Sequence, residues 1–226
     1  ARLAVDAVPR VVEVHSSADA SPQGDGQWVG HWATTMAASA TRALAAGGSA
    51  ILAVPDYRDQ EQLMAALLAV LPADRIVHLD ARQSNPDRYR ALLACLGDTP
   101  LAIVGNRSVL YAPATALALI AVWDEGDPLH NEPLSPYVHA RDIALVRQEL
   151  QGCALFFLSH SRSTEVERLV ELGWLDELAA AGPRCAELGE VITHYRSAYR
   201  ARFGVDAVAV HDAVAVLEAI LPGTLR

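Results

Sequence analysis

The stretch LIAVWDEGDPLH (residues 119–130) places three carboxylates directly after a run of apolar residues. Asp124, Glu125 and Asp127 follow what reads as a buried strand, and ligands of parallel α/β folds bind at the carboxyl ends of such strands. Carboxylates in that position are typical of the Mg²⁺ sites of nucleotide-hydrolysing enzymes. A solvated acidic loop explains the same residues equally well, so the stretch predicts either a descendant of a metal site or a surface loop.

Lysine is absent from the 226 residues, so all 18 basic side chains are arginines. The phosphate loop GxxxxGK[ST] places a lysine ammonium on the β- and γ-phosphates, and a Schiff-base enzyme also needs a lysine. Both sites are therefore excluded in this chain. The net charge of -9, from 27 acidic and 18 basic residues, disfavours strong non-specific binding to nucleic acid, because phosphate neutralisation supplies most of that affinity.

Hydrophobic residues make up 52% of the chain, enough for one sizeable core or for one core plus an appendage. No apolar run approaches the roughly 20 residues that span a bilayer, and no signal peptide is visible. The three cysteines form no CxxC pair, which disfavours a disulfide framework or a zinc site. We therefore expect a cytoplasmic protein that does not contact membranes.

Short apolar segments alternate with segments of helical periodicity, a pattern that predicts a parallel sheet with helices on both faces. Residues 1–30 read as irregular, and SSADASPQGDGQ within them reads as a loop. The tryptophans Trp28 and Trp32, at helical spacing, are interpreted as core residues rather than as a stacking platform. The predicted strands are 49–54, 75–79, 101–105, 117–123 and 154–159. The predicted helices are 31–47, 57–71, 85–97, 139–152 and 163–173, the last with Ser163 as its N-cap.

Three segments between residues 104 and 150 carry a resemblance to a known family. They are GNRSV at 105–109, WDEGD at 123–127 and YVHARD at 137–142. In the same order, the primosomal protein N′ (PriA) family of replication-restart DNA helicases has GTRSA, a DEEH box, a tyrosine-rich loop and YHARD. The chain resembles the first helicase lobe of that family, and a looser likeness extends over residues 1–178.

The resemblance implies a RecA-like lobe, of the P-loop NTPase type, that binds nucleotide and DNA. Its acidic box, which would bind Mg²⁺ and act on ATP, would fall on Asp124 and Glu125. Its nucleic-acid contacts, carried over residue by residue, would be made by Arg107, Ser108, His139 and Arg141.

The departures from the family pattern concern the hydrolytic machinery. In the most natural register Trp123 stands where the family has its Mg²⁺-linked aspartate, and Gly126 stands on the histidine. A slip of one residue restores Asp124 and Glu125 but puts Gly126 on the second glutamate, so both registers break the box. Residues 31–48, where the phosphate loop should lie, hold neither a lysine nor a glycine cluster before the helix. Degenerate actinobacterial members look like this chain, so we expect no bound cofactor and neither ATPase nor helicase activity.

The C-terminal residues 186–226 resemble the end of the inosine/uridine-preferring nucleoside hydrolases. The family segment PLHDPLAVA matches VHDAVAVLEAI at 210–220, which would make His211 the group that assists the leaving base and Asp212 a Ca²⁺ ligand. The calcium cluster DxDxxxDD of that family is missing, and Ca²⁺ takes six to eight oxygen ligands. The pattern therefore favours a helix start with an aspartate near its positive end over a working site.

We therefore expect a degenerate helicase-like lobe at 1–178 and a helical tail at 179–226. Three functional hypotheses stay open. The first is a non-catalytic module that binds single-stranded or forked DNA and replisome proteins. The second is an N-ribohydrolase that uses Ca²⁺. The third is a non-functional remnant, produced by fusion, frameshift or truncation, which the ending at Arg226 without a closing strand would suit.

Overall fold

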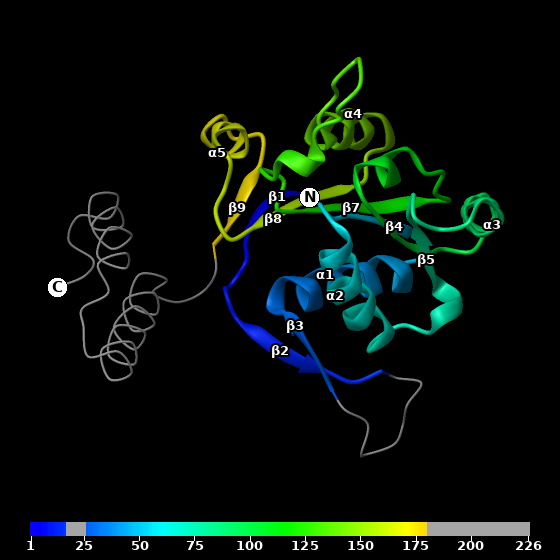
Figure 1. Cartoon of the computed structure of the whole chain (residues 1–226). Coiled ribbons are helices and arrows are strands. Elements are labelled where there is room, and N and C mark those ends of the chain that lie inside the picture. Colours follow the sequence, from blue (N-terminus) through cyan, green and yellow to red (C-terminus); the bar gives the residue numbers. More distant parts are fainter. Residues whose placement is uncertain (17–25, 180–226) are drawn as a thin grey trace, which may run out of the picture. The chain divides into compact units, whose positions relative to one another are not determined.

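A seven-stranded sheet forms the centre of the computed structural model, which describes residues 1–16 and 26–179 (Figure 1). The strand order is β5-β6-β4-β7-β8-β1-β9, and every pair of neighbours in it is parallel. The predicted α/β class with a parallel sheet is confirmed, and a RecA-like lobe fits at this coarse level. All described residues belong to one compact unit, Ala1–Ala179. The predicted helical tail lies outside them.

The sheet strands are short and apolar, as expected for strands covered on both faces. The two predicted at 117–123 and 154–159 have the bounds that their apolar runs indicated. In chain order the strands are β1 (Arg2–Asp6), β4 (Ser49–Ala53), β5 (Ile76–Leu79), β6 (Ala102–Gly105), β7 (Leu117–Trp123), β8 (Ala154–Ser159) and β9 (Asp176–Leu178).

Helices cover the two faces of the sheet separately, α1 and α2 on one side and α4 and α5 on the other (Figure 1). All five predicted helices are present, with ends within a few residues of the predicted ones. They are α1 (His31–Ala45), α2 (Tyr57–Leu68), α3 (Asn85–Cys95), α4 (Ala140–Gln151) and α5 (Thr164–Glu171). Three short 3₁₀ turns lie between them, η1 (Ala73–Arg75), η2 (Arg107–Tyr111) and η3 (Pro128–His130).

Two apolar cores result, one on each face of the sheet. Successive side chains of a strand point to opposite faces, so Leu52 of β4 joins the core under α1 and α2, while Ile51 joins the core on the other face. Met36 of α1 and Leu63 of α2 are fully buried in the first core. Val166 of α5 is buried in the second.

Side-chain caps set where the helices begin. The Asp56 carboxylate accepts hydrogen bonds from the first N–H groups of α2, and the Ser84 hydroxyl caps α3. Ser163 accepts from the Val166 N–H at the start of α5, which confirms its predicted role. These caps satisfy N–H groups that have no partner inside the helix.

The sequence predicted that residues 1–30 are irregular, and the structure differs from this prediction. This segment contains β1 and an antiparallel hairpin of β2 (Val11–Val14) and β3 (Gln27–Gly30). Trp28 therefore lies on a strand and is 63% exposed, whereas Trp32 is buried in α1. The interpretation of both as core residues is wrong for Trp28, because the change from strand to helix between them removes the helical spacing. Residues 17–25, most of the predicted loop, lie outside the described residues.

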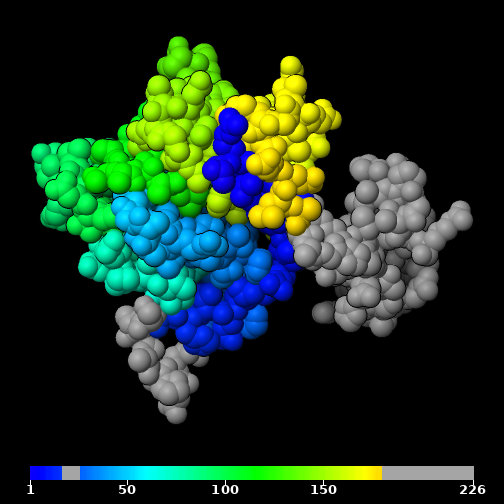
Figure 2. All heavy atoms as spheres, turned by 180° about the vertical axis from the view of Figure 1, so that it is seen from behind, coloured from blue at the N-terminus to red at the C-terminus, as the bar shows by residue number. Residues whose placement is uncertain are grey.

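Strand β1 exists because it has partners on both sides. It pairs with β8 along its full length and with β9 through Leu3, Ala4 and Val5. The Arg2 guanidinium also stacks over the Trp174 ring, 4.3 Å from its centroid. Figure 2 shows the blue N-terminal residues lying against the yellow α5–β9 segment. Within residues 1–16 and 26–179, no helix combines the length and apolar character that a membrane crossing requires.

Candidate functional site at the carboxyl edge of the sheet

The carboxyl ends of the strands bring most of the predicted residues to one edge of the sheet. β7 ends at Trp123 and leads into Asp124 and Glu125, and β6 leads into Asn106 and Arg107. Ligands of open parallel sheets bind along such an edge. We call the part near β7, α1 and α4 the β7 end, and the part near β5, α2 and α3 the β5 end.

Glu125 is buried in an ion pair at the β7 end. Its side chain is almost fully covered, and Oε1 accepts from Arg141 Nη1 at 2.5 Å and from Ser163 Oγ at 2.8 Å. Arg141 belongs to α4, and Ser163 caps α5. The carboxylate therefore ties β7 to both helices, and its charge is compensated within the protein.

Asp124 and Asp127 form the tight turn that follows Trp123. Asp124 has a φ of 46°, in the left-handed region that aspartate tolerates better than most residues. Its N–H donates to the Leu158 carbonyl at 2.8 Å, and the Asp127 carboxylate accepts from the Leu129 N–H at 2.7 Å. Burial, and next the charge of Asp127, raise the pKa of Asp124 above its usual value. The three carboxylates thus have three different environments rather than a shared one.

The Trp123 ring fills the space between β7 and α1. It is buried and stacks on Trp32 with 4.3 Å between the ring centroids and 8° between the planes. His160 meets it edge-on at 5.0 Å. Behind it, His130 is fully buried and its Nε2 bonds the Trp123 carbonyl at 2.8 Å. Burial lowers the pKa of His130. Two aromatic rings, those of Trp32 and His160, contact the Trp123 ring.

The N-terminus of α1, where the resemblance places a phosphate loop, is bonded to protein groups. The Gly30 N–H donates to Gln62 Oε1 at 2.8 Å, and the His31 N–H donates to the Arg10 carbonyl at 2.8 Å. In phosphate-binding helices such N–H groups point at the ligand instead. A glutamine of α2 and the backbone before β2 thus occupy these N–H groups at the helix end.

These residues do not fit Mg²⁺ with ATP as a P-loop lobe holds them. Mg²⁺ takes oxygen ligands, whereas Trp123 offers an indole ring and Glu125 is engaged by a guanidinium. Within residues 1–16 and 26–179, no group of three or more histidine, cysteine, aspartate or glutamate side chains is placed to hold a metal ion.

Arg107 and Ser108, predicted to contact nucleic acid, start η2 at the end of β6. Arg107 Nε donates to Glu132 Oε2 at 3.1 Å and Nη1 donates to the Leu129 carbonyl at 3.2 Å, so the guanidinium holds both η3 and the loop that follows it. Ser108 is exposed. The two neighbours therefore have different surroundings, and Ser108 is the accessible one.

His139 and Arg141 lie at the start of α4. His139 is the N-cap, and its Nδ1 accepts from the Arg141 N–H at 3.0 Å. Burial, followed by the charge of Arg141, lowers the pKa of His139. The Arg141 side chain is only 14% exposed because it pairs with Glu125. The structure thus joins Arg141 to Glu125, while His139 caps the helix that carries Arg141. His211 and Asp212 lie outside the described residues.

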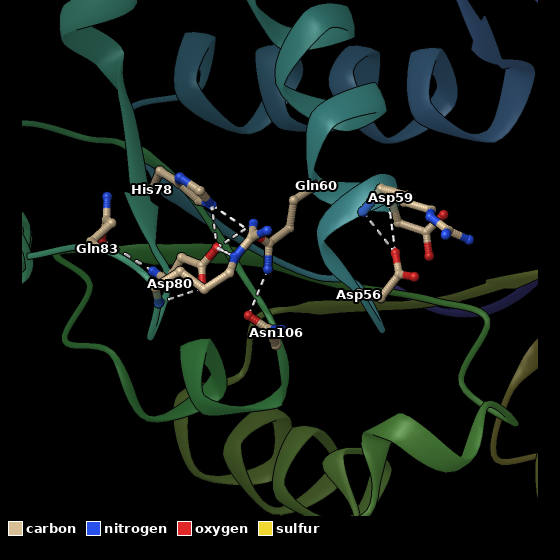
Figure 3. A network of polar contacts seen from close by, with 9 residues as sticks. Asp56, Asp59, Gln60, His78, Asp80, Gln83 and Asn106 are labelled. Carbon is tan, nitrogen blue, oxygen red and sulfur yellow. Dashed lines mark hydrogen bonds and ion pairs between the residues drawn. The ribbon is translucent and has the colours of Figure 1, made fainter.

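A polar network at the β5 end was not predicted from the sequence (Figure 3). Gln60 of α2 is buried, and its amide donates from Nε2 to Asn106 Oδ1 at 2.5 Å. Its Oε1 lies 2.7 Å from His78 Nε2. Since the amide oxygen only accepts, His78 must carry its proton on Nε2. One glutamine thereby links α2 to the ends of β5 and β6.

Asp80 continues this network from the end of β5 (Figure 3). Its carboxylate pairs with Arg82 Nη2 at 2.6 Å and lies 4.0 Å from His78. Burial alone would raise the pKa of Asp80, but the hydrogen bonds and charge of Arg82 outweigh it, so the pKa lies below its usual value. Asp80 is therefore an anion whose charge is compensated by Arg82. The only sequence feature that could have indicated it is its position directly after a strand.

Curated proteins give the same family as the sequence segments. The chain is 34% identical over 152 residues to the probable replication restart protein PriA of Mycobacterium tuberculosis, and 34% identical over 150 residues to that of Mycobacterium leprae. It is 32% identical over 126 residues to the replication restart protein PriA of Chlamydia pneumoniae. Over the matched region the chain belongs to the PriA family.

The likeness to PriA covers much of this chain and little of its relatives. The match takes in 67% of this chain and 23% of the Mycobacterium tuberculosis protein, and 55% and 17% for the Chlamydia protein. The chain thus spans about a quarter of the length of the mycobacterial PriA proteins it matches. No protein-family profile matches it.

Proposed function

We propose that residues 1–179 form a PriA-type lobe that serves replication restart by binding DNA or replisome proteins, without hydrolysing ATP. The names of the relatives support the restart role. The observation that carries the loss of hydrolysis is the burial of Glu125 against Arg141 and Ser163. A carboxylate that orients water or metal must be free to reach them.

Freeing Glu125 for catalysis would be costly. Removing one partner of a buried ion pair costs about 3–5 kcal/mol, because the other charge stays buried. A nucleotide would also have to displace the Trp32–Trp123 stack or the Gln62 and Arg10 groups that bond the N–H groups at the start of α1. Both changes would disturb packing that the lobe needs for its stability.

DNA binding by this lobe should be weak and salt-sensitive. The chain carries a net charge of -9, and Arg107 and Arg141 are engaged by Glu132 and Glu125. These two arginines are therefore not free to replace counterions on the phosphates.

The test of hydrolysis is phosphate release by the full chain with Mg²⁺-ATP and forked DNA. We expect no release above the protein-free rate, and the same for the Glu125→Gln variant. Turnover that disappears in Glu125→Gln or in Asp124→Asn would overturn the proposal.

The test of binding is the fluorescence anisotropy of labelled single-stranded and forked DNA over a series of salt concentrations. We expect weak binding that is lost as salt rises. Tight binding that persists at high salt, or no binding at low salt, would contradict the DNA part of the proposal. The proposed function would then be reduced to binding of replisome proteins.

A further inference from the structure

A cavity of about 700 Å³ opens at the β5 end, between α3 and η2. This size lies within the range of ligand pockets. Helix α3 forms one wall, although Cys95 is its only fully buried residue. The other wall is η2 with Ala112. The aromatic and polar lining residues are Asn85, Arg88, Tyr89, Ser108 and Tyr111.

Two tyrosines of the lining stand in solvent. Tyr89 is 63% exposed and Tyr111 is 67% exposed, and they come from the two different walls. Leu92, one turn after Tyr89, adds apolar surface at 40% exposure. Aromatic rings presented in this way are the usual platforms on which unpaired bases stack.

The charge around this cavity is positive although the chain is acidic. Arg88 is exposed and forms no ion pair with another described residue. Asp80, the acid in the lining, is compensated by Arg82, and the nearby Asp87 pairs with Arg90. Arg88 is therefore available to a phosphate, while the Ser108 hydroxyl can bond a base edge or a phosphate oxygen.

We infer that this cavity binds an unpaired nucleobase of single-stranded DNA, with Tyr89 and Tyr111 as stacking rings and Arg88 on a flanking phosphate. Ser108, the accessible member of the predicted nucleic-acid contacts, lies in the same lining. The choice of ligand rests on the proposed function. The site is separate from the β7 end, where Glu125 and Arg141 are paired with each other.

A nucleobase suits the lining better than an apolar peptide. Stacking gives affinity for any base because every base has a π-face, and it tolerates an open, solvent-facing pocket. An apolar peptide would leave the Arg88 guanidinium and the Asn85 amide at its edge without a charged or specific partner. Binding of an apolar peptide in place of DNA is therefore one of the outcomes that would overturn the inference.

The experiment measures binding of the full chain to a labelled oligothymidylate and to an abasic oligomer of equal length, at low salt. Tyr89→Ala and Tyr111→Ala should each weaken oligothymidylate binding about tenfold, from a loss of stacking. Tyr89→Phe keeps the ring and should bind within about twofold of the unchanged chain. The abasic oligomer should bind more weakly and should not respond to the tyrosine changes.

Arg88→Gln should weaken both probes and reduce the salt dependence of binding by about one phosphate contact. The matched control is Tyr137→Ala, since Tyr137 is 69% exposed but lies in the loop before α4, outside this cavity. It should leave the affinity unchanged. Circular dichroism of each variant shows that the fold is retained.

The outcomes separate this inference from the proposed function. If the chain binds oligothymidylate and Tyr89→Ala and Tyr111→Ala bind equally well, the cavity is not the site, while the DNA-binding proposal stands. Loss of affinity in Tyr137→Ala alone moves the contact to the loop and also overturns the inference. If the chain binds neither probe, DNA binding itself fails, and the inference fails with it.

Discussion

The two ends of the carboxyl edge carry similar residue types but use them differently. At the β7 end Glu125 pairs with Arg141, and Trp32 stacks on Trp123. At the β5 end an arginine and two tyrosines stand in solvent around a cavity. At the β7 end Glu125 is engaged by protein groups, although Asp124 and Asp127 line a cavity of about 490 Å³ at the same end. At the β5 end the two tyrosines stand in solvent. Residue type alone therefore does not decide whether a side chain at this edge can reach a ligand, whereas exposure and pairing do.

The largest effect should come from breaking the buried pair at the β7 end. Arg141→Met leaves the Glu125 carboxylate buried without its cation and should lower the free energy of unfolding by about 3–5 kcal/mol. Urea unfolding followed by circular dichroism measures this. The double variant Arg141→Met with Glu125→Met removes both charges and should recover most of the loss. A single-variant loss below about 1 kcal/mol would mean that solvent screens the pair.

Disrupting the stack of Trp123 on Trp32 should have the next largest effect on stability. Trp123→Ala removes the ring that packs between Trp32 and His160 and should cost about 3 kcal/mol. The matched control is Trp28→Ala, because Trp28 is exposed on β3 and should change stability by less than about 0.5 kcal/mol. Thermal unfolding compares the two. Equal effects would contradict the contrast between a buried and an exposed tryptophan.

Replacing Asp59 should change the stability by a smaller amount, and it should stabilise the protein rather than destabilise it. Burial, and then the charges of Asp56, Asp124 and Asp127, raise the pKa of Asp59 to about 6, above the value of about 3.9 in an unfolded chain. The stability linked to its proton is complete below the lower value and is lost as pH rises through the upper one. Asp59→Asn should therefore stabilise the protein at pH values above about 6, by about 1 kcal/mol after allowing for solvent screening.

The measurement for Asp59 is the melting temperature of both proteins across pH. The two curves should meet below about pH 4 and separate as the aspartate ionises. As a control, Asp56→Ala removes the cap of α2 and should destabilise the protein by about 1 kcal/mol. A lower melting temperature for Asp59→Asn at neutral pH would show that the carboxylate is favourable where it lies.

The smallest effect belongs to the β5 end. Tyr89→Ala removes a ring that is mostly in solvent and should change the free energy of unfolding by less than about 0.5 kcal/mol. The same variant is expected to weaken DNA binding about tenfold. Urea unfolding and anisotropy on one sample test both. A loss of stability above about 1 kcal/mol would place the ring in the core and remove the contrast between the two ends.

Much of the fold could be predicted because its strands are covered on both faces. β7 and β8 are continuous apolar runs bounded by polar residues, and such runs give sharp ends. The short strands β1 and β9 could not be predicted from local pattern. All three residues of β9 are exposed, and it is a strand because β1 pairs with it. Tertiary pairing overrides local preference in such segments.

The site could be predicted in position but not in its pairing. The acidic residues after β7 lie at the carboxyl edge as expected, yet the partners of Glu125 come from 16 and 38 residues further along the chain. Gln60 and Asn106 are 46 residues apart and carry no local pattern. Hydrogen bonds over such separations depend on how helices pack on the sheet, which a single sequence does not reveal.

The place of β1 in the sheet affects the order in which the lobe can assemble during synthesis. Its partners are Leu155 of β8 and Asp176 of β9, both about 150 residues or more later in the chain. At about 5–20 residues added per second, β1 waits on the order of ten seconds for either partner. Strands β4 to β7 can pair during that time, and β1 must stay free of other strand edges. Of the seven strands, the first to be made is thus among the last to be joined.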